Sequence, residues 1–84
     1  MMQQVQSQMP RDSLSLEFAR VLRKERLARG MSQESLAHRA GLHPTYVGLV
    51  ERGLRNPTIQ AGHRLARALR VPLSDMLREA EKRA

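Results

Sequence analysis

The chemistry for which this sequence is best equipped is the binding of a polyanion. Fifteen lysine and arginine residues face eight aspartate and glutamate residues, for a net charge of +7, and thirteen of the fifteen are arginine. The planar guanidinium group of arginine donates paired hydrogen bonds that fit the oxygens of a phosphate. Both halves of the chain, residues 1–42 and 43–84, are net positive. Neutralised phosphates and released counterions therefore favour a nucleic acid as partner, although many soluble domains are basic and a motif is needed in support.

Other chemistries find little support in the residues. The chain has no cysteine, which excludes disulfides and cysteine-ligated zinc. The three histidines, His38, His43 and His63, show no metal-ligand spacing and are expected to be solvated, so we expect neither a metal nor a cofactor. No nucleophile, general base and oxyanion-stabilising group occur together, and we expect a binding protein and not an enzyme.

The length of 84 residues corresponds to one domain. Residues 1–12 are rich in Gln and Met and lack a sustained apolar period, which predicts a flexible N-terminal tail before a domain at residues 13–84. Apolar runs of only a few residues exclude a membrane span, and the N-terminus lacks the layout of a secretory signal. We therefore expect a cytoplasmic protein.

Apolar residues recur at three- and four-residue steps along residues 13–84, which predicts helices and no strand. The first helix should run from Ser13 to Arg29 and end at Gly30. The second, Gln33 to Ala40, should be capped by the Ser32 hydroxyl and ended by Gly41. The inward residues would be Leu14, Phe18, Val21, Leu22 and, near the edge, Leu27 in the first helix, and Leu36, Ala37 and Ala40 in the second.

Three more helices are expected. The third should begin at Pro44, where proline loses no hydrogen bond, and run to about Arg52 before Gly53. Asn56-Pro57 marks a turn, Thr58 should cap the fourth helix, and Val71-Pro72 should separate it from a fifth. The fold class is therefore all-α, with five short helices. The inward residues would be Val47 and Val50, then Ile59, Leu65, Ala66 and Leu69. In the fifth helix, apolar residues recur at three- and four-residue steps at Leu73, Met76, Leu77 and Ala80.

The second and third helices meet the local requirements of a helix-turn-helix. Ala37 is the small residue that lets two helices cross closely, and Gly41 supplies the positive φ that the turn needs. A generic helical hairpin with a glycine turn would meet the same requirements, so these residues alone leave that alternative open. The apolar anchors that would face one core are Leu36, Ala40, Leu42, Val47 and Val50.

A longer match favours the helix-turn-helix. Residues Phe18 to Leu77 resemble the Cro and phage-repressor helix-turn-helix family, also called XRE-type regulators. The resemblance is carried by the Ser32-Gln33-Glu34 start of the second helix, the Glu51-Arg52-Gly53 end of the third and the Asn56-Pro57 turn. It implies a compact five-helix, lambda-repressor-like domain whose second and third helices bind DNA.

The resemblance also implies roles for particular residues. Gln33 is similar to the family glutamine that bonds a phosphate beside the amides of a helix start. The third helix would lie in the major groove, where Thr45 is the best candidate for a base contact through its hydroxyl and methyl groups. Tyr46 matches a tyrosine that often reaches phosphate, although a half-buried packing ring is an equal alternative. The other outward positions of this helix would be His43, Pro44, Gly48, Leu49 and Arg52.

Two further groups are assigned by the resemblance. Arg52, Arg55 and Asn56 would contact the phosphate backbone after the recognition helix, the alternative being ordinary solvated residues. Arg26 and Glu51 match a pair that forms an internal ion pair in this family and ties the first helix to the end of the third. We interpret that pair as structural.

Several residues depart from the family pattern. His43 stands where Ser, Thr or Asp usually caps the third helix, so a weaker cap is expected. Gly48 costs roughly 1 kcal/mol relative to alanine within a helix. Gly62 replaces a large apolar residue, so the fold must pack more closely there or leave its core less filled. The outward face of the third helix has no Gln or Asn, so base recognition would depend on Thr45, methyl contacts from Leu49 and DNA shape.

The fifth helix is expected to serve dimerisation. Family members with little beyond five helices usually pair as two-fold dimers, although the apolar stripe of this helix could instead close the core of a monomer. A symmetric dimer would place two recognition helices about 34 Å apart, matching successive major grooves of a near-palindromic operator. The stripe consists of Leu73, Met76, Leu77 and Ala80.

We therefore predict a sequence-specific, double-stranded DNA-binding transcriptional regulator that acts as a homodimer on its own promoter. The layout is similar to the controller proteins of restriction-modification systems, and stand-alone repressors and antitoxins share it. One alternative is an antitoxin-like or scaffold module whose main partner is a protein. Another is a basic protein at an anionic membrane surface, against which the turn chemistry and the core pattern argue.

Overall fold

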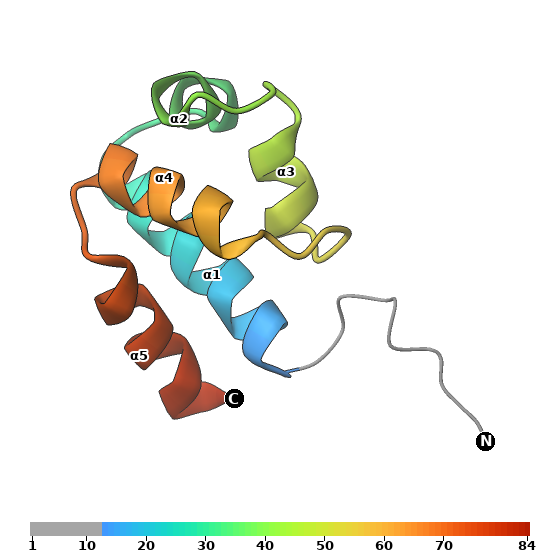
Figure 1. Cartoon of the computed structure of the whole chain (residues 1–84), viewed down its shortest axis with the longest axis vertical. Coiled ribbons are helices and arrows are strands. Elements are labelled where there is room, and N and C mark those ends of the chain that lie inside the picture. The colour runs from blue at the N-terminus through green and yellow to red at the C-terminus, as the bar shows by residue number, and fades with distance from the viewer. Residues whose placement is uncertain (1–12) are drawn as a thin grey trace.

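The computed structural model describes residues 13–84, which form five α-helices (Figure 1). They are α1 (Ser13–Ala28), α2 (Gln33–Ala40), α3 (Tyr46–Glu51), α4 (Ile59–Leu69) and α5 (Leu73–Arg83). No strand occurs within residues 13–84, and the all-α prediction is confirmed. The predicted flexible tail, residues 1–12, lies outside the described residues.

The packing of the helices leaves α2 and α3 together at one end of the molecule. α1 packs against α3 and α5, and α4 packs against α2 and α5. Figure 1 shows α5 at the end opposite α2, with α1 and α4 between them. The helix-turn-helix is therefore held from behind by α1 and α4, with its remaining surface open. None of the helices in residues 13–84 is both long enough and apolar enough to cross a membrane.

Local sequence sets the ends of most helices as predicted. Ser32 Oγ accepts a hydrogen bond from the Ser35 amide at 2.9 Å, which caps α2. Thr58 Oγ1 accepts one from the Ala61 amide at 3.0 Å, which caps α4. Gly41 ends α2 with a φ of 72°, a left-handed conformation that glycine adopts without strain.

α3 begins at Tyr46 and not at Pro44, so its predicted start was wrong. The Tyr46 amide donates to the carbonyl oxygen of His43 at 2.9 Å, which makes a tight turn of the residues between them. The first hydrogen bond between residues four apart, as in an α-helix, runs from the Leu49 amide to the carbonyl oxygen of Thr45 at 3.2 Å. Pro44 thus belongs to the turn that joins the two helices.

The core contains most of the residues predicted to face inward, with exceptions at helix ends. Ile59 is 84% exposed because it occupies the first residue of α4, beside the buried face of that helix. Leu14 and Leu27 are also exposed, so these three inward predictions were wrong. The buried cluster comprises Phe18, Val21, Leu22, Leu36, Ala37, Ala40, Val47, Val50, Leu65, Ala66, Leu69, Met76 and Ala80.

The stripe on α5 divides between the core and the surface. Met76 and Ala80 are 1% and 0% exposed inside the protomer, so their assignment to a dimer interface was wrong. They are buried because α5 turns this face toward α1, its main packing partner. Leu73 is half-buried and Leu77 is exposed, so these two residues remain available at the surface.

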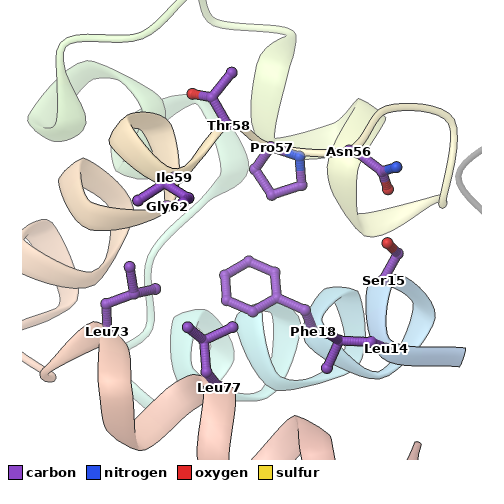
Figure 2. A pocket seen from close by; sticks show the side chains of 10 residues that line it. All are labelled: Leu14, Ser15, Phe18, Asn56, Pro57, Thr58, Ile59, Gly62, Leu73 and Leu77. Carbon is purple, nitrogen blue, oxygen red and sulfur yellow. The ribbon is translucent and has the colours of Figure 1, made fainter.

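Gly62 is accommodated by close packing. A methyl group placed on Gly62 would lie 3.5 Å from Leu73 Cδ1 and 4.0 Å from Phe18 Cζ. Leu73 therefore occupies part of the space that a large side chain on α4 would take. The other part remains a shallow hollow between α1, α4 and α5, seen in Figure 2.

Candidate nucleic-acid interface

Glu51 is the centre of a polar network that joins three helices. Arg26 of α1 donates from Nε to Glu51 Oε2 at 2.7 Å and from Nη2 to Glu51 Oε1 at 3.0 Å. Gln33, the first residue of α2, donates from Nε2 to the same Oε1 at 3.0 Å. The Arg26 and Glu51 side chains are only 7% and 2% exposed. One carboxylate at the end of α3 therefore holds both the last turn of α1 and the start of α2.

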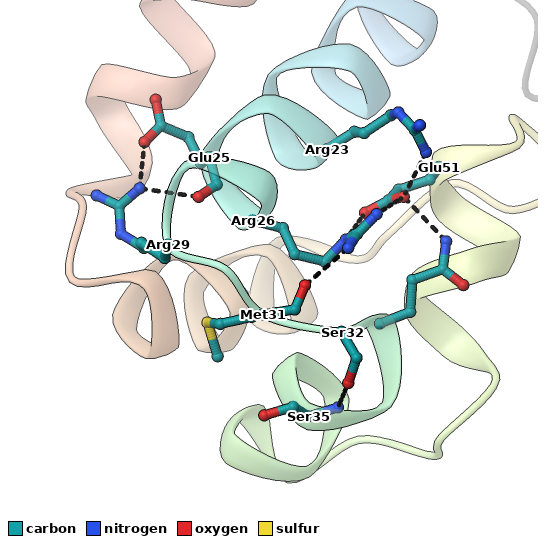
Figure 3. Close-up of polar contacts among 9 residues, drawn as sticks. Arg23, Glu25, Arg26, Arg29, Met31, Ser32, Ser35 and Glu51 are labelled. Carbon is teal, nitrogen blue, oxygen red and sulfur yellow. Dashed lines mark hydrogen bonds and ion pairs between the residues drawn. The ribbon is translucent and has the colours of Figure 1, made fainter.

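The network fixes the chain between α1 and α2 as well. Arg26 Nη1 donates to the carbonyl oxygen of Met31 at 2.8 Å, as Figure 3 shows. The hydrogen bonds to Glu51 raise the pKa of Arg26 above its ordinary value, against the opposing effect of burial. The guanidinium is therefore charged, donates three of its five N–H groups within the protein, and is buried, so we assign it a structural role.

Arg23 is a member of this network that the sequence reasoning missed. Its Nη1 lies 3.8 Å from Glu51 Oε1, and its side chain is 60% exposed. The sequence does indicate this role, because Arg23 lies three residues before Arg26 and both side chains therefore share one face of α1. Arg23 brings an additional positive charge to the edge of the α2–α3 surface.

Gly48 does not project outward, so that prediction was wrong. It is buried in the middle of α3, and a methyl group placed on it would lie 3.0 Å from Gln33 Oε1. The side chain of Gln33 therefore crosses α3 directly over Gly48 on its way to Glu51. A side chain at this position would press against the end of the Gln33 side chain, which would have to shift.

The other predicted positions around α3 differ in exposure. His43, Pro44, Thr45 and Arg52 are exposed, and Leu49 is half-buried. Tyr46 is half-buried with its side chain against the core cluster, so its ring contributes to packing. Val47 and Val50 turn the opposite face of α3 into the core. The exposed residues gather at the two ends of the helix and not along its middle.

His43 caps the turn into α3 through its ring. The Thr45 amide donates to His43 Nδ1 at 3.2 Å, and Thr45 Oγ1 lies 3.0 Å from the same nitrogen. This bond lies in the turn before α3 and satisfies the amide of Thr45, the N-cap residue itself. The Thr45 side chain makes no capping hydrogen bond to the first turn of α3, so the expectation of a weaker cap is confirmed.

The connection from α3 to α4 carries free positive charge. Arg52, Arg55 and Asn56 are all exposed. Arg52 and Arg55 take part in none of the ion pairs found within residues 13–84, whereas Arg20, Arg26, Arg29 and Arg78 each have a carboxylate partner. Gly53, with a φ of 73°, turns the chain back after α3 and so sets Arg52 and Arg55 on either side of the bend.

Comparisons with known proteins agree with this geometry. A family model described as helix-turn-helix matches residues 22–76. The chain is 37% identical over 67 residues to the control protein C.BamHI of Bacillus amyloliquefaciens, which covers 79% of this chain and 83% of that protein. It is 42% identical over 60 residues to the control protein C.SmaI of Serratia marcescens, covering 71% of each.

Solved structures show the same similarity. The restriction-modification controller protein C.AhdI from Aeromonas hydrophila has a TM-score of 0.71 and 42% sequence identity, over 74% of this chain and 94% of that one. The wild-type restriction-modification controller protein C.Esp1396I has a TM-score of 0.76 and 32% identity, over 87% and 97% of the two chains.

Proposed function

Because the chain belongs to the helix-turn-helix family of DNA-binding transcriptional regulators, we propose that it acts as a homodimer on a near-palindromic operator upstream of its own gene. The family comprises regulators and not enzymes, and this chain resembles restriction-modification controller proteins. Its proposed location is the cytoplasm, together with the DNA that it binds. The partner is double-stranded DNA, with no cofactor.

The observation that carries this proposal is the way Glu51 fixes α3 relative to α1 and α2. A helix that enters the major groove must hold its orientation to place side chains at base edges. Glu51 supplies that constraint through Arg26 and Gln33. The exposed residues at the start of α3, above all Thr45, are then proposed to meet the bases.

The phosphate contacts are proposed for both flanks of the recognition helix. Gln33 keeps one amide hydrogen beyond its bond to Glu51, and the amides at the start of α2 favour an anion. Arg52, Arg55 and Asn56 would contact phosphates beyond the other end of α3. The Tyr46 hydroxyl is proposed to reach the backbone while its ring stays against the core.

Replacement of Arg52 by alanine tests the phosphate contacts. The variant removes one phosphate contact from each protomer of the proposed dimer, so the slope of log affinity against log salt should fall by about two. The measurement is DNA affinity by fluorescence anisotropy over a range of salt concentrations. Arg78→Ala is the matched control because it removes the same charge from α5, where Arg78 pairs with Asp75. Equal slopes for Arg52→Ala and Arg78→Ala would contradict the assignment.

Replacement of Gly48 by alanine tests the position of Gln33. Alanine in a helix interior is favoured over glycine by about 0.5–1 kcal/mol, which offsets the loss of the bond from Gln33 to Glu51, so the variant should unfold near the wild-type urea concentration. The added methyl group would displace Gln33, and loss of one hydrogen bond to phosphate should weaken DNA binding roughly fivefold. The same substitution in a Gln33→Ala background should have no effect on affinity. An equal loss in both backgrounds would show that Gly48 acts independently of Gln33.

The dimer is proposed to form through the hollow between α1, α4 and α5. Ile59 protrudes beside the hollow (Figure 2). Leu14, Leu73 and Leu77 border the hollow, and Gly62, which has no side chain, leaves part of it unfilled. Around a two-fold axis, a protruding side chain next to a hollow can insert into the hollow of the partner, and the reverse contact follows by symmetry. The proposed interface therefore contains Leu73 and Leu77, together with Ile59 and Leu14. Met76 and Ala80 are no longer assigned to it.

The experiment that tests the proposed function compares two duplexes by fluorescence anisotropy. One is the DNA immediately upstream of the gene, and the other is a random duplex of the same length, at about 50–200 mM salt. We expect tight binding to the upstream DNA that survives salt better than binding to the random duplex. Equal, steeply salt-sensitive binding to both would contradict an autoregulatory role. Absence of binding to any duplex would favour a module whose partner is a protein.

A further inference from the structure

The contact between His43 and Thr45 restricts where the hydroxyl proton of Thr45 can lie. His43 Nδ1 accepts the Thr45 amide at 3.2 Å, so this nitrogen presents a lone pair and the ring carries its proton on Nε2. Thr45 Oγ1 lies 3.0 Å from the same lone pair. Two lone pairs at this distance repel each other unless a proton lies between them. With the tautomer that the Thr45 amide assigns to His43, the hydroxyl of Thr45 donates to Nδ1.

The turn contains nothing that competes for this arrangement. The intervening residue is Pro44, which has no amide hydrogen to offer to the ring and holds its own φ near a fixed value. His43, Pro44 and Thr45 are all exposed. Water is therefore the competitor for these groups, and the bond to His43 Nδ1 biases the orientation of the hydroxyl before DNA arrives. The Thr45 oxygen is left with lone pairs alone toward the solvent side.

We propose that His43 is a specificity-determining residue, which makes Thr45 an acceptor of hydrogen bonds from a base. A free threonine hydroxyl can donate or accept, and so it discriminates poorly among base edges. As an acceptor only, Thr45 favours an exocyclic amine in the major groove, which is N6 of adenine or N4 of cytosine. The carbonyl oxygens of guanine and thymine offer it no proton. This inference rests on the proposed placement of the start of α3 in the major groove.

A simple helix cap would have a different consequence. If His43 only satisfied the Thr45 amide, its loss would lower stability and affinity for all sequences by a similar factor. The contact with Thr45 Oγ1 adds a dependence on the identity of one base. The two roles are therefore separated by the pattern of base preference and not by overall affinity.

The test is selection of bound duplexes from a random library, followed by affinity measurements on duplexes that differ at one position. The wild-type chain should show one position in each half-site where adenine or cytosine is favoured over guanine and thymine, by roughly five- to tenfold. In His43→Ala the hydroxyl is free to donate, and the preference should fall to about twofold or less. In His43→Asn the side-chain oxygen can accept both protons, and the preference should return.

Thr45→Val separates failure of this inference from failure of the proposed function. It should abolish the preference, and adding His43→Ala to it should change the preference no further. If Thr45→Val abolishes the preference but His43→Ala retains it, His43 does not orient the hydroxyl. If Thr45→Val retains the preference, Thr45 does not meet a base, and the proposed placement of α3 is overturned together with the inference. Circular dichroism of each variant establishes that it is folded.

Discussion

Replacement of Glu51 by alanine should lower the free energy of unfolding by about 3–5 kcal/mol. Within residues 13–84, the loss removes the one carboxylate that Arg26 hydrogen-bonds; its side chain is 7% exposed and keeps its bond to the Met31 carbonyl oxygen. A buried charge without a partner costs far more free energy than the intact pair contributes to stability. Since whole domains are stable by roughly 5–15 kcal/mol, such a variant should be close to unfolding. Urea denaturation followed by circular dichroism measures the effect.

An exposed ion pair supplies the control for Glu51→Ala. Asp75→Asn removes the carboxylate that pairs with Arg78 at 3.0 Å on the surface of α5. Exposed pairs contribute at most about 1 kcal/mol, so this variant should unfold near the wild-type urea concentration. A destabilisation by Glu51→Ala as small as that of Asp75→Asn would contradict the central position given to Glu51.

The raised pKa of Arg26 sets the pH range over which this guanidinium contributes to stability. The pKa of Arg26 is raised in the folded protein, so its contribution is fully present below the unfolded pKa. It is lost only as the pH rises through the folded value, in strongly alkaline solution. Neutral and mildly acidic pH therefore leave the contribution of this guanidinium intact.

Replacement of Ile59 by glutamate should convert the proposed dimer to a monomer and weaken operator binding by about a hundredfold or more. The side chain is 84% exposed in the protomer, so the charge should not disturb folding. At a two-fold interface, however, it would bury two carboxylates in apolar hollows, which is costly without a partner charge. Analytical ultracentrifugation reports the assembly state, and anisotropy on the upstream duplex reports the affinity.

Leu27→Glu is the matched control for Ile59→Glu. Leu27 is 52% exposed on α1 and does not border the hollow, so the same charge there should leave both assembly and affinity unchanged. A wild-type chain that sediments as a monomer would contradict the homodimer. An Ile59→Glu variant that remains dimeric would place the interface on another surface.

The elements of this fold could be predicted from short-range signals. Ser32, Gly41 and Thr58 act through bonds to residues only a few positions away, and the caps they make are those expected. The start of α3 was misplaced because proline suits both a first helical residue and a turn. In the structure Pro44 lies in a turn where the Thr45 amide donates to His43 Nδ1, and sequence spacing does not reveal that contact.

The surface was harder to predict because exposure depends on which element covers each residue. An apolar residue at helical spacing can face the core, as Met76 does, or remain open, as Ile59 does. Gly48 shows the same limit, because its burial comes from Gln33, which lies on another helix. Helical periodicity identified the face of each helix, but contacts between helices determined which positions are open to DNA or to a second subunit.

The measurement that tests the central claim most directly is a titration of the labelled protein with the upstream duplex, followed by amide chemical shifts in NMR. We expect the largest changes at the start of α2, at the start of α3 around Thr45, and around Arg52 and Arg55. The amides of α5 should change little once the dimer has formed. Large changes confined to α4 and α5, with none at Gln33 or Thr45, would contradict DNA binding through α2 and α3.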